Sequence, residues 1–211
     1  MAENALLLID LQNDFCAHGA LEVPGGDDVV PIANALMPRF SQVVATADAH
    51  PPTHLSFASN HSGKVVYEQM ELDGLTQVLW PDHCVAGTPG AALHPKLNRD
   101  GIHRVVEKGT DPRIDSYSGF FDNGHRKQTA LHDYLQSQGV KALYVMGLAT
   151  DFCVKWSVLD ALRLGYRVHL VQDGCRGVGL AANDVDDALS VMREAGATFT
   201  SSAEVLSAMY E

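Results

Sequence analysis

Residues 142–161 constrain the fold of this chain more than any other part of the sequence. They begin with a short apolar run that ends at Gly147, which is typical of a strand buried on both faces. Apolar residues then recur at helical spacing up to the stop signal of Gly165, namely Val154, Val158, Ala161 and Leu162. Cys153 therefore falls in the first turn of the predicted helix, where unpaired backbone N–H groups favour a thiolate. This cysteine is a candidate nucleophile.

Apolar runs of strand length alternate with helical patterns along most of the chain. The predicted strands are 5–9, 43–46, 103–106, 142–146 and 167–171, with a weaker one at 198–200. Helical stripes begin near Val29, Leu131 and Val185, and Ser201 with Glu204 can form a capping box for a last helix. This alternation predicts a single α/β domain over 1–211, with a mostly parallel central sheet in a three-layer α/β/α arrangement.

Residues 49–101 break the alternation. They are rich in proline, glycine and histidine, show no sustained period, and hold five of the ten histidines. A segment this long without regular structure usually has a function of its own. We predict an irregular insert that binds a ligand or a metal ion.

Composition excludes several classes of partner. A formal net charge of −11 argues against nucleic acid and anionic membranes, which require clustered Lys and Arg. No apolar run approaches the length of a membrane span, and the start of the chain lacks the pattern of a secretory leader. The four cysteines are widely spaced, so we expect free thiols and a cytoplasmic protein. Whether the chain forms a homo-oligomer stays open.

Four consecutive strands end in residues that carry chemistry. In parallel α/β sheets, ligands bind beyond the carboxyl ends of the strands. The first strand leads to Asp10, the second to Asp48 and His50, the third to Lys108 and the fourth to Cys153. One polar residue after a strand is usually a cap or a turn former. Four strands in succession predict a functional edge of the sheet.

These residues lie in motifs that resemble those of the nicotinamidase/pyrazinamidase group of the isochorismatase-like cysteine hydrolase superfamily. The motifs are Asp10-Leu-Gln-Asn-Asp-Phe15, Asp48-Ala-His50, Trp80-Pro-Asp-His83-Cys-Val, Glu107-Lys108-Gly and Gly147-Leu-Ala-Thr-Asp-Phe-Cys153-Val. The resemblance covers residues 6–196, nearly the whole chain, with the motifs in the expected order. It implies a nicotinamidase that hydrolyses the carboxamide of nicotinamide, and of pyrazinamide, to the acid and ammonia in NAD salvage.

The resemblance also assigns catalytic roles. Cys153 would attack the carboxamide carbon and form a thioester, while Asp10 would take the thiol proton and later deliver it to ammonia. Lys108 would hold this pair by electrostatic attraction. A cis peptide bond before Ala149 is implied, with the N–H groups of Ala149 and Cys153 directed at the oxyanion.

A divalent metal ion is the implied cofactor. The resemblance places Asp48, His50, His54 and His83 around it, and a carboxylate with imidazoles suits Zn, Fe or Mn. The fourth ligand varies in the family, so either His54 or water completes the coordination.

The ion is expected to bind the ring nitrogen of the substrate and so to set its distance from the thiol. Phe15, Trp80 and Tyr117 match positions that sandwich the flat ring, next to Ala149.

Three other functions fit the sequence less well. Vinyl-ether cleavage of isochorismate is disfavoured, because enzymes of that type generally lack the cysteine that stands at 153. An amidase for carbamoyl compounds would not need the Asp-His-His cluster. A non-catalytic scaffold of the same fold is disfavoured by the intact set of Asp10, Lys108 and Cys153.

Overall fold

A six-stranded parallel sheet forms the centre of the molecule. The structure is a computed structural model that describes residues 3–208, so the outermost ends of the predicted domain 1–211 lie outside the described residues. The strand order is β5-β2-β1-β6-β7-β8, and every neighbouring pair is parallel. The strands are β1 (Asn4–Ile9), β2 (Val43–Asp48), β5 (Arg104–Lys108), β6 (Ala142–Leu148), β7 (Arg167–Arg176) and β8 (Thr198–Thr200).

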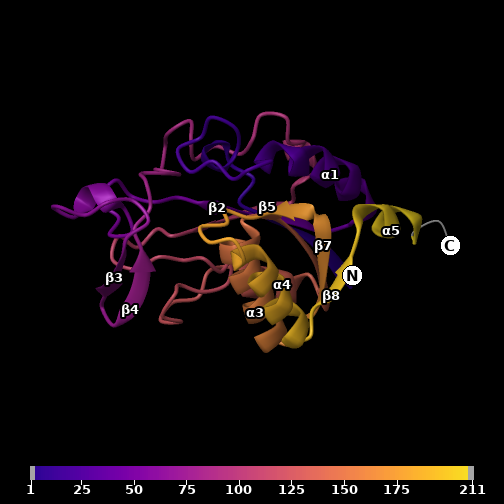
Figure 1. Ribbon diagram of the computed structural model, residues 1–211. Coiled ribbons are helices and arrows are strands. Elements are labelled where there is room, and N and C mark those ends of the chain that lie inside the picture. Colours follow the sequence, from indigo (N-terminus) through magenta and orange to yellow (C-terminus); the bar gives the residue numbers. More distant parts are fainter. Residues whose placement is uncertain (1–2, 209–211) are drawn as a thin grey trace.

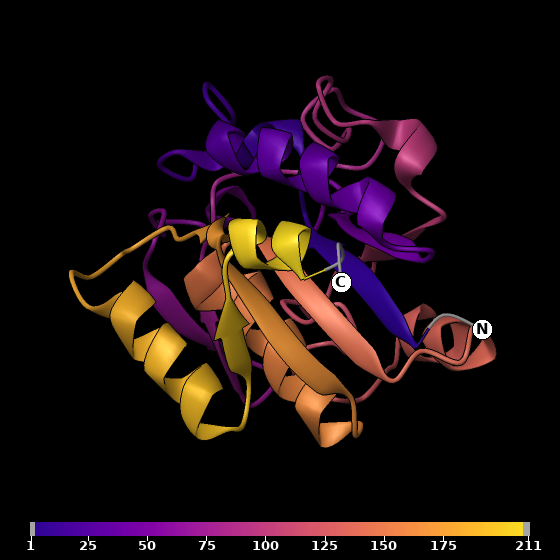
Figure 2. The ribbon, with the colours of Figure 1, turned by 90° about the vertical axis from the view of Figure 1, so that its right-hand side faces the viewer.

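Helices cover both faces of this sheet, which confirms the predicted three-layer architecture (Figures 1 and 2). One face carries α1 (Val29–Leu36) and α5 (Ser202–Ser207), and the other carries α3 (Lys155–Arg163) and α4 (Asp184–Glu194). Helix α2 (Leu131–Ser137) lies between β5 and β6 in the chain. The capping box of Ser201 and Glu204 is present at α5. Within residues 3–208, no helix combines the length and the apolar character that crossing a membrane requires.

Several strands run further than their apolar cores predicted. β2 continues to Asp48 and β5 continues to Lys108, and the parallel register pairs these two residues with each other. The apolar run marks only the part of a strand that is packed between helix layers, whereas the backbone ladder continues into the polar edge. Asp48 and Lys108 are therefore held by the sheet itself rather than by the loops that follow it.

The insert is less irregular than predicted. It contains a two-stranded antiparallel hairpin, β3 (Gln69–Leu72) and β4 (Leu75–Val78), which lies at the left of Figure 1. Its turn residues Asp73 and Gly74 have φ angles of 51° and 80°. Two positive φ angles are what a tight hairpin turn requires, and Asp-Gly is a strong sequence signal for it. That signal was present in the sequence and was missed.

Candidate active site

Three residues, each at or after the end of a different strand, meet at the carboxyl edge of the sheet. Asp10 follows β1, Lys108 is the last residue of β5, and Cys153 follows β6. The Lys108 ammonium nitrogen lies 2.9 Å from Asp10 Oδ2 and 3.5 Å from Cys153 Sγ. All three side chains are buried. The structure therefore brings together the acid, the amine and the thiol that the sequence singled out.

The carboxylate of Asp10 is held in one orientation. The residue has a φ of 51°, a left-handed conformation that Asp tolerates better than most residues. The Thr46 hydroxyl donates to Asp10 Oδ1 at 2.6 Å and accepts from the Asp10 backbone N–H at 3.3 Å. One carboxylate oxygen of Asp10, one of Asp48 and the Cys153 sulfur lie within 4.8 Å of one another. Asp10 is thus close enough to exchange a proton with the thiol.

Burial and charge determine the protonation states of this group. Burial raises the pKa of Asp10 to about 6, although Lys108 opposes the shift. Burial alone would lower the pKa of Lys108, but the carboxylates of Asp10 and Asp48 hold that pKa well above its usual range. Burial also raises the pKa of the Cys153 thiol well above its usual range, against the opposing effect of Lys108. At neutral pH the centre therefore holds an ammonium, an ionised carboxylate and a neutral thiol.

The backbone around Cys153 differs from the sequence-based prediction in two respects. The cysteine lies in a π-helical turn, Thr150–Val154, that precedes α3, rather than in the first turn of an α-helix. Its thiol is not acidic, because burial raises the pKa of Cys153 well above its usual range. The N–H groups of Phe152 and Val154 both donate to the Ala149 carbonyl, at 3.1 and 3.0 Å. The peptide bond between Leu148 and Ala149 is cis, as the resemblance implied.

Three of the expected metal ligands form one cluster. The ligand atoms of Asp48, His50 and His83 all lie within 4.8 Å of one another, and all three residues are buried. His50 Nδ1 donates to the Gly109 carbonyl and His83 Nδ1 donates to the Pro81 carbonyl, each at 2.8 Å. Because a carbonyl can only accept, each of these rings has Nε2 left for a metal ion.

The charges around the cluster also suit a cation. Burial lowers the pKa of His83 to about 4, so its ring is neutral. For His50, the Asp48 carboxylate outweighs burial and raises the pKa to about 9. An ion bound at Nε2 takes the place of that proton. The residues present therefore fit one divalent ion.

His54 belongs to a different group. Its ring lies with His50 and Asp115, whose ligand atoms are within 4.8 Å of one another. Its buried Nε2 has no hydrogen-bond partner among the described residues, while Nδ1 lies 2.7 Å from the Ser56 hydroxyl. Asp115 was missed in the sequence analysis. The only available signal was its position two residues before Tyr117, since no strand or helix pattern marks it.

A cavity joins the ion cluster to the thiol. Asp48 and His83 line one part of it, and Ala149 and Cys153 line another. The aromatic side chains of Phe15, Trp80, Tyr117 and Phe152 also line it.

The walls of this cavity are held in place by ring contacts. The Trp80 and Phe152 rings meet edge to face at 4.8 Å, and Phe15 meets His83 in the same way at 5.5 Å. The Trp80 indole N–H donates to the Tyr117 hydroxyl at 3.2 Å. Phe152, to which the sequence analysis assigned no role, is thus part of the aromatic wall.

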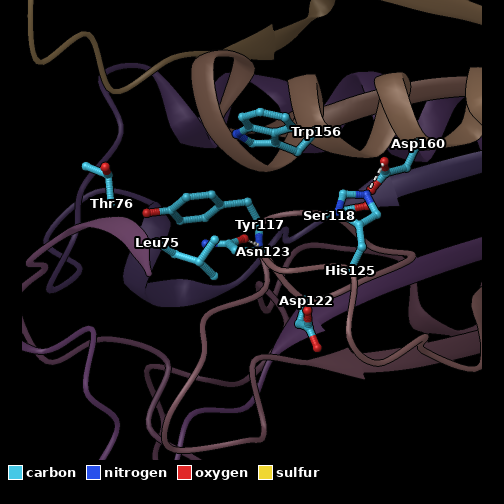
Figure 3. Close-up of a pocket in the computed structure, with 9 residues that line it drawn as sticks. All are labelled: Leu75, Thr76, Tyr117, Ser118, Asp122, Asn123, His125, Trp156 and Asp160. Atoms are coloured by element: carbon cyan, nitrogen blue, oxygen red, sulfur yellow. Dashed lines mark hydrogen bonds and ion pairs between the residues drawn. The ribbon is translucent and has the colours of Figure 1, made fainter. Parts of the chain in front are cut away.

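A second hollow shares Tyr117 with this cavity (Figure 3). Trp156 and Asp160 of α3 line it together with Leu75 of β4 and His125, whose ring nitrogen Nε2 lies 2.8 Å from Asp160 Oδ1. Its lining residues include no cysteine. The nucleophile is therefore reached from the first cavity.

In a further cluster of Cys16, Asp27 and His94, a hydrogen bond joins His94 to Asp27. The Lys96 backbone N–H donates to His94 Nδ1 at 3.3 Å, so Nε2 carries the proton and donates to Asp27 at 3.1 Å. This is the reverse of the arrangement at His50 and His83. Burial, with Asp27 nearby, raises the pKa of the Cys16 thiol to about 12. The cluster is best explained as a structural contact that joins two loops.

The fold and the cavity place the protein among enzymes that bind small ligands at the carboxyl edge of a parallel sheet. The Isochorismatase domain matches residues 4–204, and the protein belongs to this family. It is 53% identical to the nicotinamidase of Escherichia coli over 202 residues, 94% of each chain.

Solved structures agree with this assignment. A nicotinamidase/pyrazinamidase of Acinetobacter baumanii superposes with a TM-score of 0.94 at 40% identity, covering 97% of this chain and 99% of that one. The pyrazinamidase of Pyrococcus horikoshii in complex with zinc superposes with a TM-score of 0.77 at 35% identity, covering 94% and 99%.

Proposed function

We propose that the protein is a nicotinamidase, which hydrolyses nicotinamide to nicotinate and ammonia and acts on pyrazinamide in the same way. The observation that carries the proposal is the cavity, which is lined by aromatic side chains and extends from an Asp-His-His cluster to a buried thiol. In a substrate that carries a carboxamide on an aromatic ring, the ring would face the ion cluster and the carboxamide would face the thiol. The high identity to a nicotinamidase supports the same substrate, and this reaction serves NAD salvage.

The proposed chemistry proceeds through Cys153. Asp10 takes the thiol proton as the sulfur attacks the carboxamide carbon, and the backbone N–H groups of Ala149 and Cys153 stabilise the oxyanion. Asp10 then protonates the nitrogen, the C–N bond breaks, and ammonia leaves a thioester. Asp10 next takes a proton from water, which attacks the thioester. The C–S bond breaks, Asp10 returns its proton to the Cys153 sulfur, and the acid is released.

Lys108 supports both halves of the reaction without exchanging a proton itself. Its ammonium contacts Asp10 and Cys153, so it stabilises negative charge on whichever of the two carries it. Its contact with Asp48, at 2.6 Å, links the thiol to the ion cluster.

We propose that Asp48, His50 and His83 hold the divalent ion, which is zinc in the Pyrococcus horikoshii relative. When bound, the ion supplies a Lewis-acidic anchor for the ring nitrogen. Phe15, Trp80 and Tyr117 then orient the ring so that the carboxamide faces the thiol.

The direct test is ammonia release from nicotinamide before and after ion removal. We expect turnover by the loaded protein, with one nicotinate formed per ammonia. Chelation should weaken nicotinamide binding more than it lowers the unfolding temperature. Equal binding of nicotinamide by the ion-free protein would contradict the anchoring role. No turnover by the loaded protein would contradict the proposed activity.

The pKa of Asp10 predicts the acid limb of the pH profile. Asp10 must be ionised to accept the thiol proton, and burial raises its pKa to about 6. The value of kcat/KM should therefore fall about tenfold per pH unit below pH 6, and should be level just above it. Steady-state rates with nicotinamide between pH 4.5 and pH 8 measure this. A profile that is flat through pH 5 would rule out Asp10 as the base.

A further inference from the structure

The turn that carries Cys153 contains a buried carboxylate that has no role in the scheme above. Asp151 lies two residues before the nucleophile in the π-helical turn Thr150–Val154 and is 2% exposed. Its Oδ1 accepts from the Val178 backbone N–H at 3.0 Å, and its Oδ2 accepts from the Gly179 backbone N–H at 2.8 Å. Both oxygens of this carboxylate therefore bind the same loop, and hydrogen bonds to a carboxylate are stronger than those between neutral groups.

The loop that Asp151 binds follows β7 and leads to α4. Its residues 177–183 form neither strand nor helix, so no backbone ladder holds them in place. A Cβ on Gly177 would lie 3.1 Å from Asp151 Oδ1 and 2.3 Å from Val185 Cγ2, so only glycine lets the loop approach both. The loop is thus packed directly against the carboxylate and depends on its two hydrogen bonds.

The turn that supplies the carboxylate has hydrogen bonds of its own. The Ala149 carbonyl accepts from the N–H groups of Phe152 and Val154, and the turn continues directly into α3. The turn therefore keeps its shape without the loop. The dependence runs from the turn to the loop.

The held loop forms part of the substrate cavity. Val178 lines this cavity together with Phe152 and Cys153. We propose that Asp151 is a positioning residue, which holds the loop at Val178 so that the cavity wall keeps the carboxamide in the orientation that the thiol attacks. This inference rests on the proposed function. A displacement of about 1 Å in such a wall can lower the rate about 100-fold, because the reactive geometry is then less populated.

The kinetic test is Asp151→Asn. An amide accepts through one oxygen only and turns an NH₂ group toward the other backbone N–H, so one of the two bonds is lost. For nicotinamide, kcat should fall about 10- to 100-fold. KM should change much less, because the ion still anchors the ring. Zinc affinity should not change, since Asp151 is not among the proposed ligands.

Asp184→Asn is the matched control. Asp184 Oδ2 accepts from the Ala181 backbone N–H at 2.7 Å, so this variant removes the same charge and a similar bond from the same loop. It leaves the bonds of Val178 and Gly179 intact, and its kcat should stay close to that of the unmodified protein. A kcat for Asp151→Asn equal to that of this control would overturn the proposal.

Val178→Ala tests the route by which Asp151 acts. It shortens the wall but keeps both backbone bonds to the carboxylate, so kcat should fall while the loop stays in place. The double variant should lose less than the product of the two single losses, because both changes act on one wall. Losses that multiply fully, or an unchanged kcat in Val178→Ala, would overturn the proposed route.

Hydrogen exchange tests the contact without any substrate. In Asp151→Asn, the backbone N–H groups of Val178 and Gly179 should exchange about 10- to 100-fold faster than in the unmodified protein, since each donates to a buried carboxylate. In Asp184→Asn the same two groups should exchange at the unmodified rate. Exchange that stays equally slow in Asp151→Asn would overturn the proposal. Turnover of nicotinamide by the unmodified protein tests the proposed function separately.

Discussion

Cys153→Ala is expected to lower ammonia release from nicotinamide by roughly 10⁴-fold to 10⁶-fold, the usual consequence of removing a catalytic nucleophile. Without the sulfur no thioester can form, and the remaining groups can only orient the amide. The Cys153 side chain is not a ligand of the ion in the proposed scheme, so the zinc affinity should not change. Initial rates measure the loss of ammonia release, and competition with a chelating dye measures the zinc affinity.

Cys175→Ala is the matched control for this loss. Cys175 is also a buried free thiol, on β7, and its thiol donates to the Val171 carbonyl. Turnover by this variant should stay within a few-fold of the unmodified protein. Retention of more than a few per cent of activity by Cys153→Ala would rule out the sulfur as the nucleophile.

Lys108→Met is expected to destabilise the ion-free protein by about 3–5 kcal/mol at neutral pH, because it leaves buried carboxylates without their counter-charge. The ammonium lies 2.9 Å from Asp10 and 2.6 Å from Asp48, and its side chain is fully buried. Methionine fills a similar volume, so the loss is electrostatic rather than a packing defect. Urea unfolding followed by fluorescence measures it.

The pH dependence of this loss has a definite sign. In the unmodified protein Lys108 lowers the pKa of Asp48 and limits the rise at Asp10. Without the ammonium, burial raises both pKa values above those of the unfolded chain, so the penalty is present above those values and is lost as the pH falls. The difference in stability should therefore narrow from pH 7 toward pH 4.

Lys141→Met provides the comparison. Lys141 is 69% exposed in its side chain and pairs with Glu3 at the surface, so its removal should cost at most about 1 kcal/mol. A Lys108→Met protein as stable as Lys141→Met at pH 7 would contradict the account of the buried ion pairs.

The elements that a periodic pattern marks were predictable from the sequence. The five stronger strands, the parallel sheet and the helix that follows Cys153 come from apolar periodicity and from glycine stop signals, and the structure contains all of them. The positions of Asp10 and Lys108 at one edge follow from the same pattern, because parallel strands bring their carboxyl ends together. The motif resemblance then supplied the histidines.

What the sequence could not supply depends on packing between segments far apart in the chain. Asp115 approaches His50 and His54 only because the loop after β5 folds back over the insert, and no local pattern encodes that approach. The raised pKa of the Cys153 thiol depends on its burial by the folded chain, which its place before a helix does not reveal. The hairpin of β3 and β4 is a different case, since its Asp-Gly turn could be predicted from the local sequence.

The central claim is that the Cys153 sulfur carries the acyl group during turnover, and the most direct test is rapid acid quenching of the protein with excess nicotinamide followed by peptide mass spectrometry. We predict a nicotinoyl thioester on the peptide that contains Cys153, present during turnover and absent from Cys153→Ala. Steady ammonia release with that peptide unmodified, or with the acyl group on another residue, would contradict the account.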